Sequence, residues 1–211
     1  MTPTREEFYN ALIERHGAEN QKKFDKATVA ICGLGGLGSN ISICLARAGV
    51  GKLILIDFDK VDISNLHRQQ YKAAQVGIPK TQALSDNLKE INPYITIETH
   101  NTKVTEENVI ELIKDADLVC EAFDKAENKA MLVNAILENA PEKYLVSSSG
   151  MAGFGSANLI KTKKISKRVF LSGDSVSDVN DGIGLISSRV MVCAAHEAHM
   201  ALRILMGETE T

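Results

Sequence analysis

The stretch ATVAICGLGGLG (residues 27–38) decides the fold, because an apolar, β-branched run there ends directly on closely spaced glycines. Such a run is typical of a strand that is buried on both faces of a sheet. The glycines lead into an apolar pattern that predicts a helix over residues 36–49, which Gly49 and Gly51 end. A strand, a glycine turn and a helix in this order predict a nucleotide-binding α/β unit.

The same alternation of strand and helix continues outward from this stretch along the chain. It predicts a doubly wound, mostly parallel, Rossmann-like α/β sheet with right-handed crossovers. A Gly- and Ser-rich crossover segment, residues 151–186, interrupts the pattern with one or two strands and a loop, and a C-terminal helix follows it. Further strands are expected over residues 52–57, 95–99, 117–120 and 144–148, and further helices over 5–25, 79–91, 105–114, 126–139 and 188–206.

The length of 211 residues fits one domain with a substantial core and is short for two. We expect a single domain over residues 1–211. Its parts would be an N-terminal helix (1–26), a nucleotide-binding core (27–150), and the crossover segment with the closing helix (151–211).

Composition excludes several classes of protein. The net charge of −3 does not suit a basic nucleic-acid platform, and 44% hydrophobic residues do not suit a disordered chain. No run of 18 apolar residues predicts a membrane span, and the charged stretch over residues 1–17 lacks a signal-peptide core. The four cysteines form no C-x-x-C pair, so neither a disulfide framework nor a zinc site is expected, and the natural setting is the cytoplasm.

The glycine turn and the acid after the next strand together predict a nucleotide. Gly33, Gly35 and Gly38 form G-x-G-x-x-G, which lets the backbone approach a phosphate at a helix N-terminus. Asp57 lies 19 residues beyond Gly38, where its carboxylate can accept hydrogen bonds from both ribose hydroxyls. An NAD-dependent oxidoreductase would show the same pair, so this alternative stays open.

Charged residues beyond that acid favour phosphoryl or nucleotidyl transfer over hydride transfer. Arg68 lies in a polar segment that the fold does not need, and Lys80 lies in the first turn of a predicted helix. A cation there is unfavourable unless an anion such as a triphosphate lies opposite, and such cations stabilise the charge that develops in phosphoryl transfer. Asp124 follows the strand at 117–120 at the ligand-binding edge and offers the oxygen ligands that Mg²⁺ prefers; Glu121 is a less favoured candidate.

The order of these motifs resembles the ThiF/MoeB/HesA family, the bacterial relatives of ubiquitin-activating enzymes. The resemblance runs from about residue 27 to residue 150. The short length of the chain and its SDVNDG sequence (177–182) further resemble compact ThiF-type proteins of thiamine synthesis. The motifs that carry it are GLGGLGSN (33–40), DFD (57–59), SNLHRQQ (64–70), GIPK (77–80) and INP (91–93), followed by the acid after the fourth strand.

The resemblance implies ATP- and Mg²⁺-dependent adenylation of the C-terminal carboxylate of a small ubiquitin-like sulfur carrier protein that ends in Gly-Gly. It implies that Arg68, Lys80 and Asp124 are catalytic and that Asp124 binds the Mg²⁺. It also implies a homodimer. Zinc is not expected, because the C-x-x-C pairs of many family members are missing here, and the composition predicts neither a nucleic-acid nor a membrane partner. The residues expected to bind the nucleotide are Gly33, Gly35, Gly36, Gly38, Asp57, Asp59, Ser64, Asn65, Arg68 and Lys80.

The sequence also departs from the family pattern. Lys125 stands where an asparagine is common, and residues 145–187 contain no cysteine for a covalent step. We therefore expect this chain to activate the carrier and another protein to transfer the sulfur. Arg15 is the nearest candidate for an arginine lent to a neighbouring subunit, although its spacing to the glycine turn fits poorly. A family member that is non-catalytic or acts on another partner stays open as a further alternative.

Two other patterns are more simply structural. Cys193, His196 and His199 lack the i, i+4 spacing of a zinc protease, so we expect no metal there. The basic run KTKKISKR (161–168) is expected to form a solvated hairpin, and Cys32 and Cys44 are expected in the core.

Overall fold

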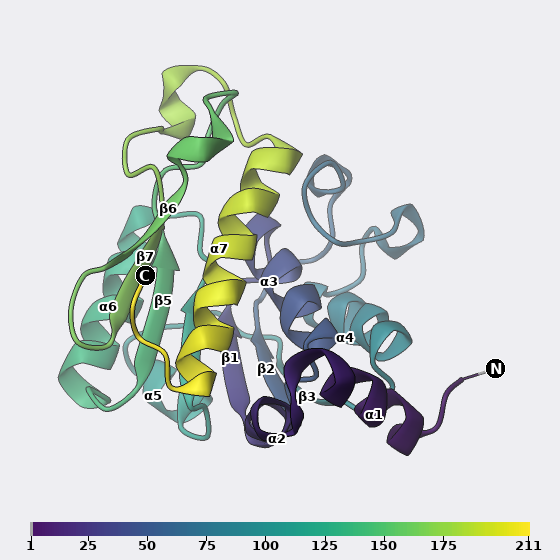
Figure 1. Ribbon diagram of the computed structural model, residues 1–211. Helices are drawn as coiled ribbons and strands as arrows, with labels where there is room; N and C mark the ends of the chain where they lie inside the picture. Colours follow the sequence, from purple (N-terminus) through teal and green to yellow (C-terminus); the bar gives the residue numbers. More distant parts are fainter. Residues whose placement is uncertain (1) are drawn as a thin grey trace.

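The computed structural model describes residues 2–211, apart from the side chain of residue 181. Its centre is a seven-stranded sheet in the order β3-β2-β1-β4-β5-β7-β6, in which only β6 runs antiparallel to its neighbour (Figure 1). The predicted doubly wound α/β fold is confirmed. The strands are β1 (Thr28–Cys32), β2 (Lys52–Ile56), β3 (Thr96–His100), β4 (Leu118–Glu121), β5 (Tyr144–Ser148), β6 (Lys161–Lys164) and β7 (Val169–Gly173).

Helices cover both faces of this sheet, because alternate side chains of the strands enter two separate cores. Val29 and Ile31 of β1 face the first core, whereas Ala30 and Cys32 face the second. The first core is covered by α2 (Ala18–Lys26), α3 (Gly36–Arg47), α4 (Lys80–Ile91) and α7 (Ser187–Met206), and the second by α5 (Val109–Ile113) and α6 (Ala126–Asn139).

The crossover segment follows the expected course. The basic run forms the β6–β7 hairpin, and β7 pairs in parallel with β5, so the hairpin extends the main sheet. The segments on either side of the hairpin lie together at the top of Figure 1, next to the beginning of α7. The short 3-10 helices in the chain are η1 (Ile63–Asn65), η2 (Ala73–Gln75), η3 (Ala157–Leu159) and η4 (Val179–Asp181).

The N-terminal region differs from the single helix expected over residues 5–25. It forms α1 (Arg5–His16) and α2, which are separated by Gly17. Gly17 has φ 78°, a conformation that favours glycine, and its amide donates to the Ile13 carbonyl at 2.8 Å, so the first helix ends there. The helix predicted over 105–114 is also shorter in the structure. The Thr105 amide donates to the Asn108 side chain at 2.8 Å, so these residues form a turn before α5 begins.

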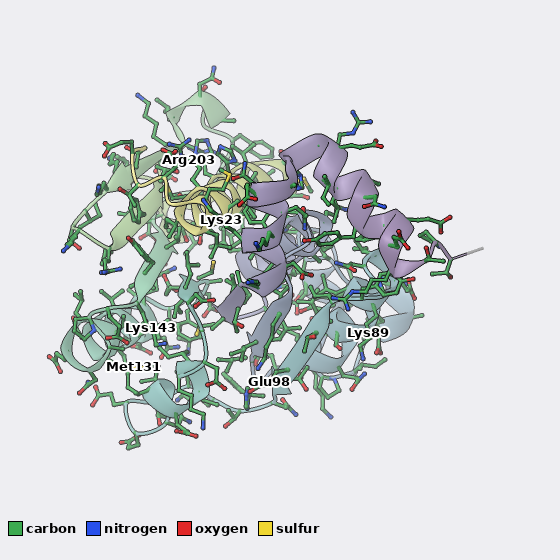
Figure 2. The ribbon with its side chains drawn as sticks, turned by 60° about the horizontal axis from the view of Figure 1, so that its bottom comes forward. Lys23, Lys89, Glu98, Met131, Lys143 and Arg203 are labelled. Atoms are coloured by element: carbon green, nitrogen blue, oxygen red, sulfur yellow. The ribbon has the colours of Figure 1, made fainter. Side chains whose placement is uncertain are left out.

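Lysines help to close the amino edge of the sheet, which Figure 2 brings forward. The Lys23 ammonium donates to the Met206 carbonyl at the end of α7, at 2.6 Å. The Lys143 ammonium donates to the carbonyls of Lys114 and Ala116 just after α5, at 2.9 and 2.7 Å. Cations at helix C-termini satisfy free carbonyls and oppose the negative end of the helix dipole, so they stabilise these ends.

In residues 2–211, no helix combines the length and the hydropathy needed to cross a membrane.

Candidate active site

The glycine turn between β1 and α3 depends on two close backbone approaches. Gly33 has φ 92°, and a Cβ atom at this position would lie 2.7 Å from the Ala122 carbonyl oxygen. A Cβ atom on Gly38 would lie 1.8 Å from the Gly33 carbonyl oxygen. Only glycine fits at these two positions, so α3 begins close against the end of β1. Gly35 and Gly36 lie half-buried between them, at the N-terminus of α3.

Asp57, directly after β2, holds this turn from the side. Its carboxylate accepts the Leu34 amide at 2.6 Å and the Asp59 amide at 2.8 Å. Burial raises the pKa of Asp57, against the opposing effects of the nearby Lys80 ammonium and of these two amides. One carboxylate oxygen therefore already stabilises the glycine turn in the chain itself, which sequence reasoning did not foresee.

Tyr71 supports the same turn and was also missed. Its buried hydroxyl donates to the Leu34 carbonyl at 2.7 Å, so both backbone groups of Leu34 are bound by side chains from outside the turn. Burial raises the pKa of this phenol, and the hydroxyl stays a donor.

Lys80 lies in the first turn of α4, as predicted, but its anionic partner belongs to the protein. Its ammonium is buried and lies 2.8 Å from an Asp59 carboxylate oxygen and 4.0 Å from an Asp57 oxygen. An anion therefore does lie opposite this cation, but the chain itself supplies it, in Asp59 and Asp57. A role of this cation toward bound phosphates stays a prediction.

The segment that carries Ser64, Asn65 and Arg68 is a compact turn built around η1. Asp62 accepts both the amide and the hydroxyl of Ser64, at 2.8 and 2.6 Å, and the Asn65 side chain accepts the Asp62 amide at 3.2 Å. From the other side, the Asn40 amide group of α3 donates to the Arg68 carbonyl at 3.2 Å. The motif is therefore fastened to the helix that follows the glycine turn.

The Arg68 side chain lies half-buried over the beginning of α3. A Cβ atom added to Gly36 would lie 3.5 Å from the Arg68 Cγ atom, so the side chain passes close to this glycine. The buried Nε of Arg68 has no hydrogen-bond partner in the described part of the chain. Burial lowers the pKa of this guanidinium, and the nearby Asp124 carboxylate acts in the opposite direction. Arg68, Asp124 and the glycine turn therefore meet at one edge of the sheet.

His67, expected to be a spacer, bridges to the crossover segment. Its Nδ1 lies 2.9 Å from the Ser64 carbonyl oxygen and its Nε2 lies 3.2 Å from the Leu185 carbonyl oxygen. The polar segment and the residues just before α7 are thereby connected.

The two acids near the end of β4 differ sharply. Asp124 is exposed, and within residues 2–211 no hydrogen bond to its carboxylate is formed, so both oxygens are accessible to a cation. Glu121 is fully buried and bound by Lys129, Ser147 and the Phe123 amide. An exposed carboxylate suits a Mg²⁺ ion shared with substrate phosphates, whereas Glu121 is not available for one.

None of the four cysteines is exposed, and of the remaining residues singled out by the sequence only Lys125 lies next to Asp124. Burial raises the pKa of the thiols of Cys32, Cys44, Cys120 and Cys193, which makes each a weak nucleophile. Glu197 and Cys193 are buried in α7, and the described residues contain no group of three or more His, Cys, Asp or Glu that could hold a metal ion. Arg15 is exposed in the last turn of α1, and Lys125 is the exposed N-cap of α6.

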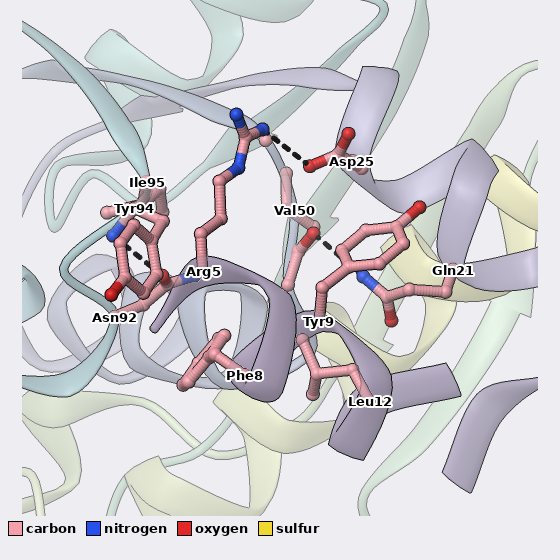
Figure 3. A pocket seen from close by; sticks show the side chains of 12 residues that line it. Arg5, Phe8, Tyr9, Leu12, Gln21, Asp25, Val50, Asn92, Tyr94 and Ile95 are labelled. Carbon is pink, nitrogen blue, oxygen red and sulfur yellow. Dashed lines mark hydrogen bonds and ion pairs between the residues drawn. The ribbon is translucent and has the colours of Figure 1, made fainter. Parts of the chain in front are cut away.

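Two hollows in the surface lie away from this edge. The pocket in Figure 3 is lined by α1, α2 and the segments that lead into β2 and β3, among them Phe8, Tyr9 and Asn92. A second hollow is lined by residues around the beginnings of β4 and β5, including Asp117 and Tyr144. Both lie at the amino edge of the sheet, opposite the carboxyl edge where doubly wound folds bind ligands, so neither is the candidate site.

Comparison with protein families decides the assignment of the chain. The model of the ThiF family matches residues 9–211. The chain belongs to the ThiF family. The expectation drawn from the motif series is confirmed at this level.

Relatives and solved structures give this ThiF-family chain a wider setting. It is 30% identical over 202 residues to the adenylyltransferase and sulfurtransferase MOCS3 of Culex quinquefasciatus, covering 93% of this chain and 45% of the relative. It is 33% identical over 141 residues to the sulfur carrier protein adenylyltransferase of Thermus thermophilus, covering 66% of this chain and 47% of the relative. The chain thus spans less than half the length of these relatives. The structure of the E. coli tRNA N6-threonylcarbamoyladenosine dehydratase TcdA in complex with ATP has the same fold, with a TM-score of 0.87, 22% identity and 98% of both chains covered.

Proposed function

We propose that this ThiF-family chain catalyses the ATP-dependent adenylation of the C-terminal glycine carboxylate of a small ubiquitin-like sulfur carrier protein. A carboxylate oxygen of the carrier attacks the α-phosphorus of ATP, an acyl-adenylate forms, and pyrophosphate leaves. The names of the relatives support this reaction class. The pathway we propose is thiamine synthesis, on the strength of the compact ThiF-type resemblance of the SDVNDG segment.

The observation that carries the proposal is the position of Arg68, which lies over the beginning of α3 and near enough to Asp124 for the two charges to interact. A guanidinium beside a helix N-terminus suits the oxygens of a phosphate chain, where negative charge increases as pyrophosphate leaves. In hydride transfer no charge develops on phosphate oxygens, so the arrangement favours nucleotidyl transfer.

The other residues take roles that suit their surroundings. Gly33, Gly35, Gly36 and Gly38 give the nucleotide access to the amides of α3. Asp57 and Asp59 bind the ribose side, and Ser64, Asn65 and Lys80 bind the phosphate side. No general base is required, because the carrier carboxylate is already ionised near pH 7.

Asp124 is the residue that would hold Mg²⁺, since its exposed carboxylate follows β4 at the carboxyl edge. When bound, this ion supplies charge neutralisation along the triphosphate. The residues of the chain hold the carrier carboxylate in line with the α-phosphorus of ATP. The buried thiols support the view that sulfur transfer falls to another protein.

Part of the proposed surface for the carrier is the crossover segment. It displays several exposed apolar side chains, and its Leu185 carbonyl lies 3.2 Å from the His67 ring of the site. The exposed apolar side chains are Phe154, Leu159, Val176, Val179 and Ile183. An apolar surface of this kind suits a protein partner more than a small metabolite. We propose that the enzyme is a homodimer and that its setting is the cytoplasm.

The test is ATP–pyrophosphate exchange, measured with and without a carrier that ends in Gly-Gly. We expect exchange to depend on the carrier and to fall at least about a hundredfold in Arg68→Ala and in Asp124→Ala. Arg47→Ala is the matched control, because Arg47 is an exposed arginine at the other end of α3, and it should retain full exchange. Full exchange in both Arg68→Ala and Asp124→Ala would contradict the roles proposed for these two residues. Absence of exchange with every Gly-Gly carrier would favour a family member that acts on another partner.

A further inference from the structure

A buried ionic cluster lies directly behind the candidate site. Glu121, the last residue of β4, is fully buried, and its carboxylate accepts four hydrogen bonds. The Lys129 ammonium donates to both oxygens at 3.0 and 2.9 Å, the Ser147 hydroxyl donates at 2.5 Å, and the Phe123 amide donates at 2.7 Å. The cluster therefore joins β4, β5, α6 and the loop after β4.

All three partners donate to Glu121, and the Lys129 ammonium and the Phe123 amide can only donate, so the position suits a group that accepts. An ionised carboxylate is such a group. Taking a carboxylate out of water is unfavourable, and an apolar residue of similar size would often stabilise the fold as well or better. The presence of an acid here is therefore better explained by what it holds than by the packing of the core.

What it holds is the loop that carries Asp124. On one side, the Ala122 amide donates to the Cys32 carbonyl at 2.8 Å, and the Ala122 carbonyl lies against Gly33. On the other side, Glu121 binds the Phe123 amide, one residue before Asp124. Lys129, one turn into α6, fastens the chain again after Asp124. The exposed acid thus lies between fixed points on both sides.

We propose that Glu121 is a positioning residue that fixes the Asp124 loop for a nucleotide-bound Mg²⁺ ion, acting through the Phe123 amide and Lys129. Glu121 is fully buried, so its role is an indirect one. The inference rests on the proposed function, because it assumes that Asp124 holds the metal. Side chains that orient metal ligands typically change metal affinity or activity by about 10 to 100 fold when they are removed.

The test uses Glu121→Gln in the full chain. The amide preserves the size of the side chain but presents an NH₂ group, which can donate to the Ser147 hydroxyl but not to the Lys129 ammonium or the Phe123 amide, so at least one contact is lost. We expect hydrogen–deuterium exchange of the amides in residues 122–126 to be at least about tenfold faster. We also expect the half-saturating Mg²⁺ concentration in ATP–pyrophosphate exchange to rise about tenfold or more. Binding of metal-free ATP should change less than about twofold, since Glu121 does not face the nucleotide.

Asp117→Asn is the matched control. Asp117 immediately precedes β4 at its other end, and its carboxylate also accepts a backbone amide, that of Thr28 at 2.8 Å. This variant should leave both the exchange of the loop amides and the Mg²⁺ dependence unchanged.

Ser147→Ala is the second variant, because Glu121→Gln could prevent folding. It removes one bond to Glu121 without altering charge, and it should also increase loop exchange and the Mg²⁺ requirement, by a smaller factor. The proposal is overturned if Glu121→Gln shows the loop exchange and the Mg²⁺ dependence of the unmodified protein. If Glu121→Gln does not fold, the same result in Ser147→Ala overturns it. Asp124→Asn distinguishes the two hypotheses: if it leaves the Mg²⁺ dependence unchanged, the proposed role of Asp124 fails, whereas loop exchange still reports on Glu121.

Discussion

Gly33 concentrates two requirements in one residue: a positive φ and a close approach to the Ala122 carbonyl. Gly77 provides a matched control, because its φ of 88° is similar but a Cβ atom there would have no neighbour within 4 Å. We expect Gly77→Ala to lower the free energy of unfolding by about 1–2 kcal/mol, the usual penalty for a left-handed conformation. Gly33→Ala should lose a further 1–3 kcal/mol or so, because backbone must move to accommodate the methyl group. Urea denaturation measures both, and equal losses would show that the approach to Ala122 is unimportant.

Single residues also mark the limit of what the sequence could predict. The spacing of Asp57, Arg68 and Asp124 after predicted strands was enough to bring them to one edge, because parallel strands end together. The partner of Lys80 was not predictable from spacing, since Asp59 lies 21 positions away and reaches it only through the fold. The partners of Glu121 were not predictable for the same reason, because Ser147 meets it only when β4 and β5 pair.

At the scale of elements, the crossover segment is fastened to α7 by one buried ion pair. Asp174, just after β7, accepts the Arg189 guanidinium at 2.6 Å, and Arg189 also donates to the Ala152 carbonyl. Burial by itself raises the pKa of Asp174, but the amides of Ser177 and Val176 together with Arg189 lower it more, so the net pKa lies below its usual value. The pair therefore stabilises the fold only while Asp174 is ionised.

The sign of the pH effect follows from that lowered pKa. The contribution is fully present above the unfolded pKa of about 4 and is lost as the pH falls through the folded value. We expect Asp174→Asn to be less stable than the unmodified chain at pH 6, and the difference in unfolding free energy to shrink steadily below pH 4. Glu111→Gln, which breaks an exposed pair with Lys114, should have little effect at either pH. A difference that is constant with pH would contradict this role for Asp174.

The boundaries of elements were predictable where burial alternates or glycine and proline interrupt the pattern. β5 and α6 match their predicted ranges: β5 begins with an apolar run directly after Lys143, and α6 ends two residues before Pro141. The break between α1 and α2 was missed because α1 buries no residue. Its sequence therefore shows no regular apolar face that would mark where the helix ends. His16-Gly17 was the available signal, since a basic residue followed by glycine often ends a helix.

At the scale of the whole molecule, the sheet presents one ligand edge, and the choice between ATP and NAD can be tested on the intact fold. A ligand that binds only the folded state at 100 times its Kd adds about 2.7 kcal/mol of stability. For a chain of this size that corresponds to a rise in Tm of about 5 to 10 °C. We expect Mg²⁺ with ATP to raise the Tm by this amount and NAD at the same concentration to leave it within about 1 °C. Arg68→Ala should reduce the ATP effect, because the guanidinium lies where the phosphates would bind, whereas Arg47→Ala should not. A rise with NAD and none with ATP would move the chain from nucleotidyl transfer to redox chemistry, because the glycine turn and Asp57 suit either nucleotide.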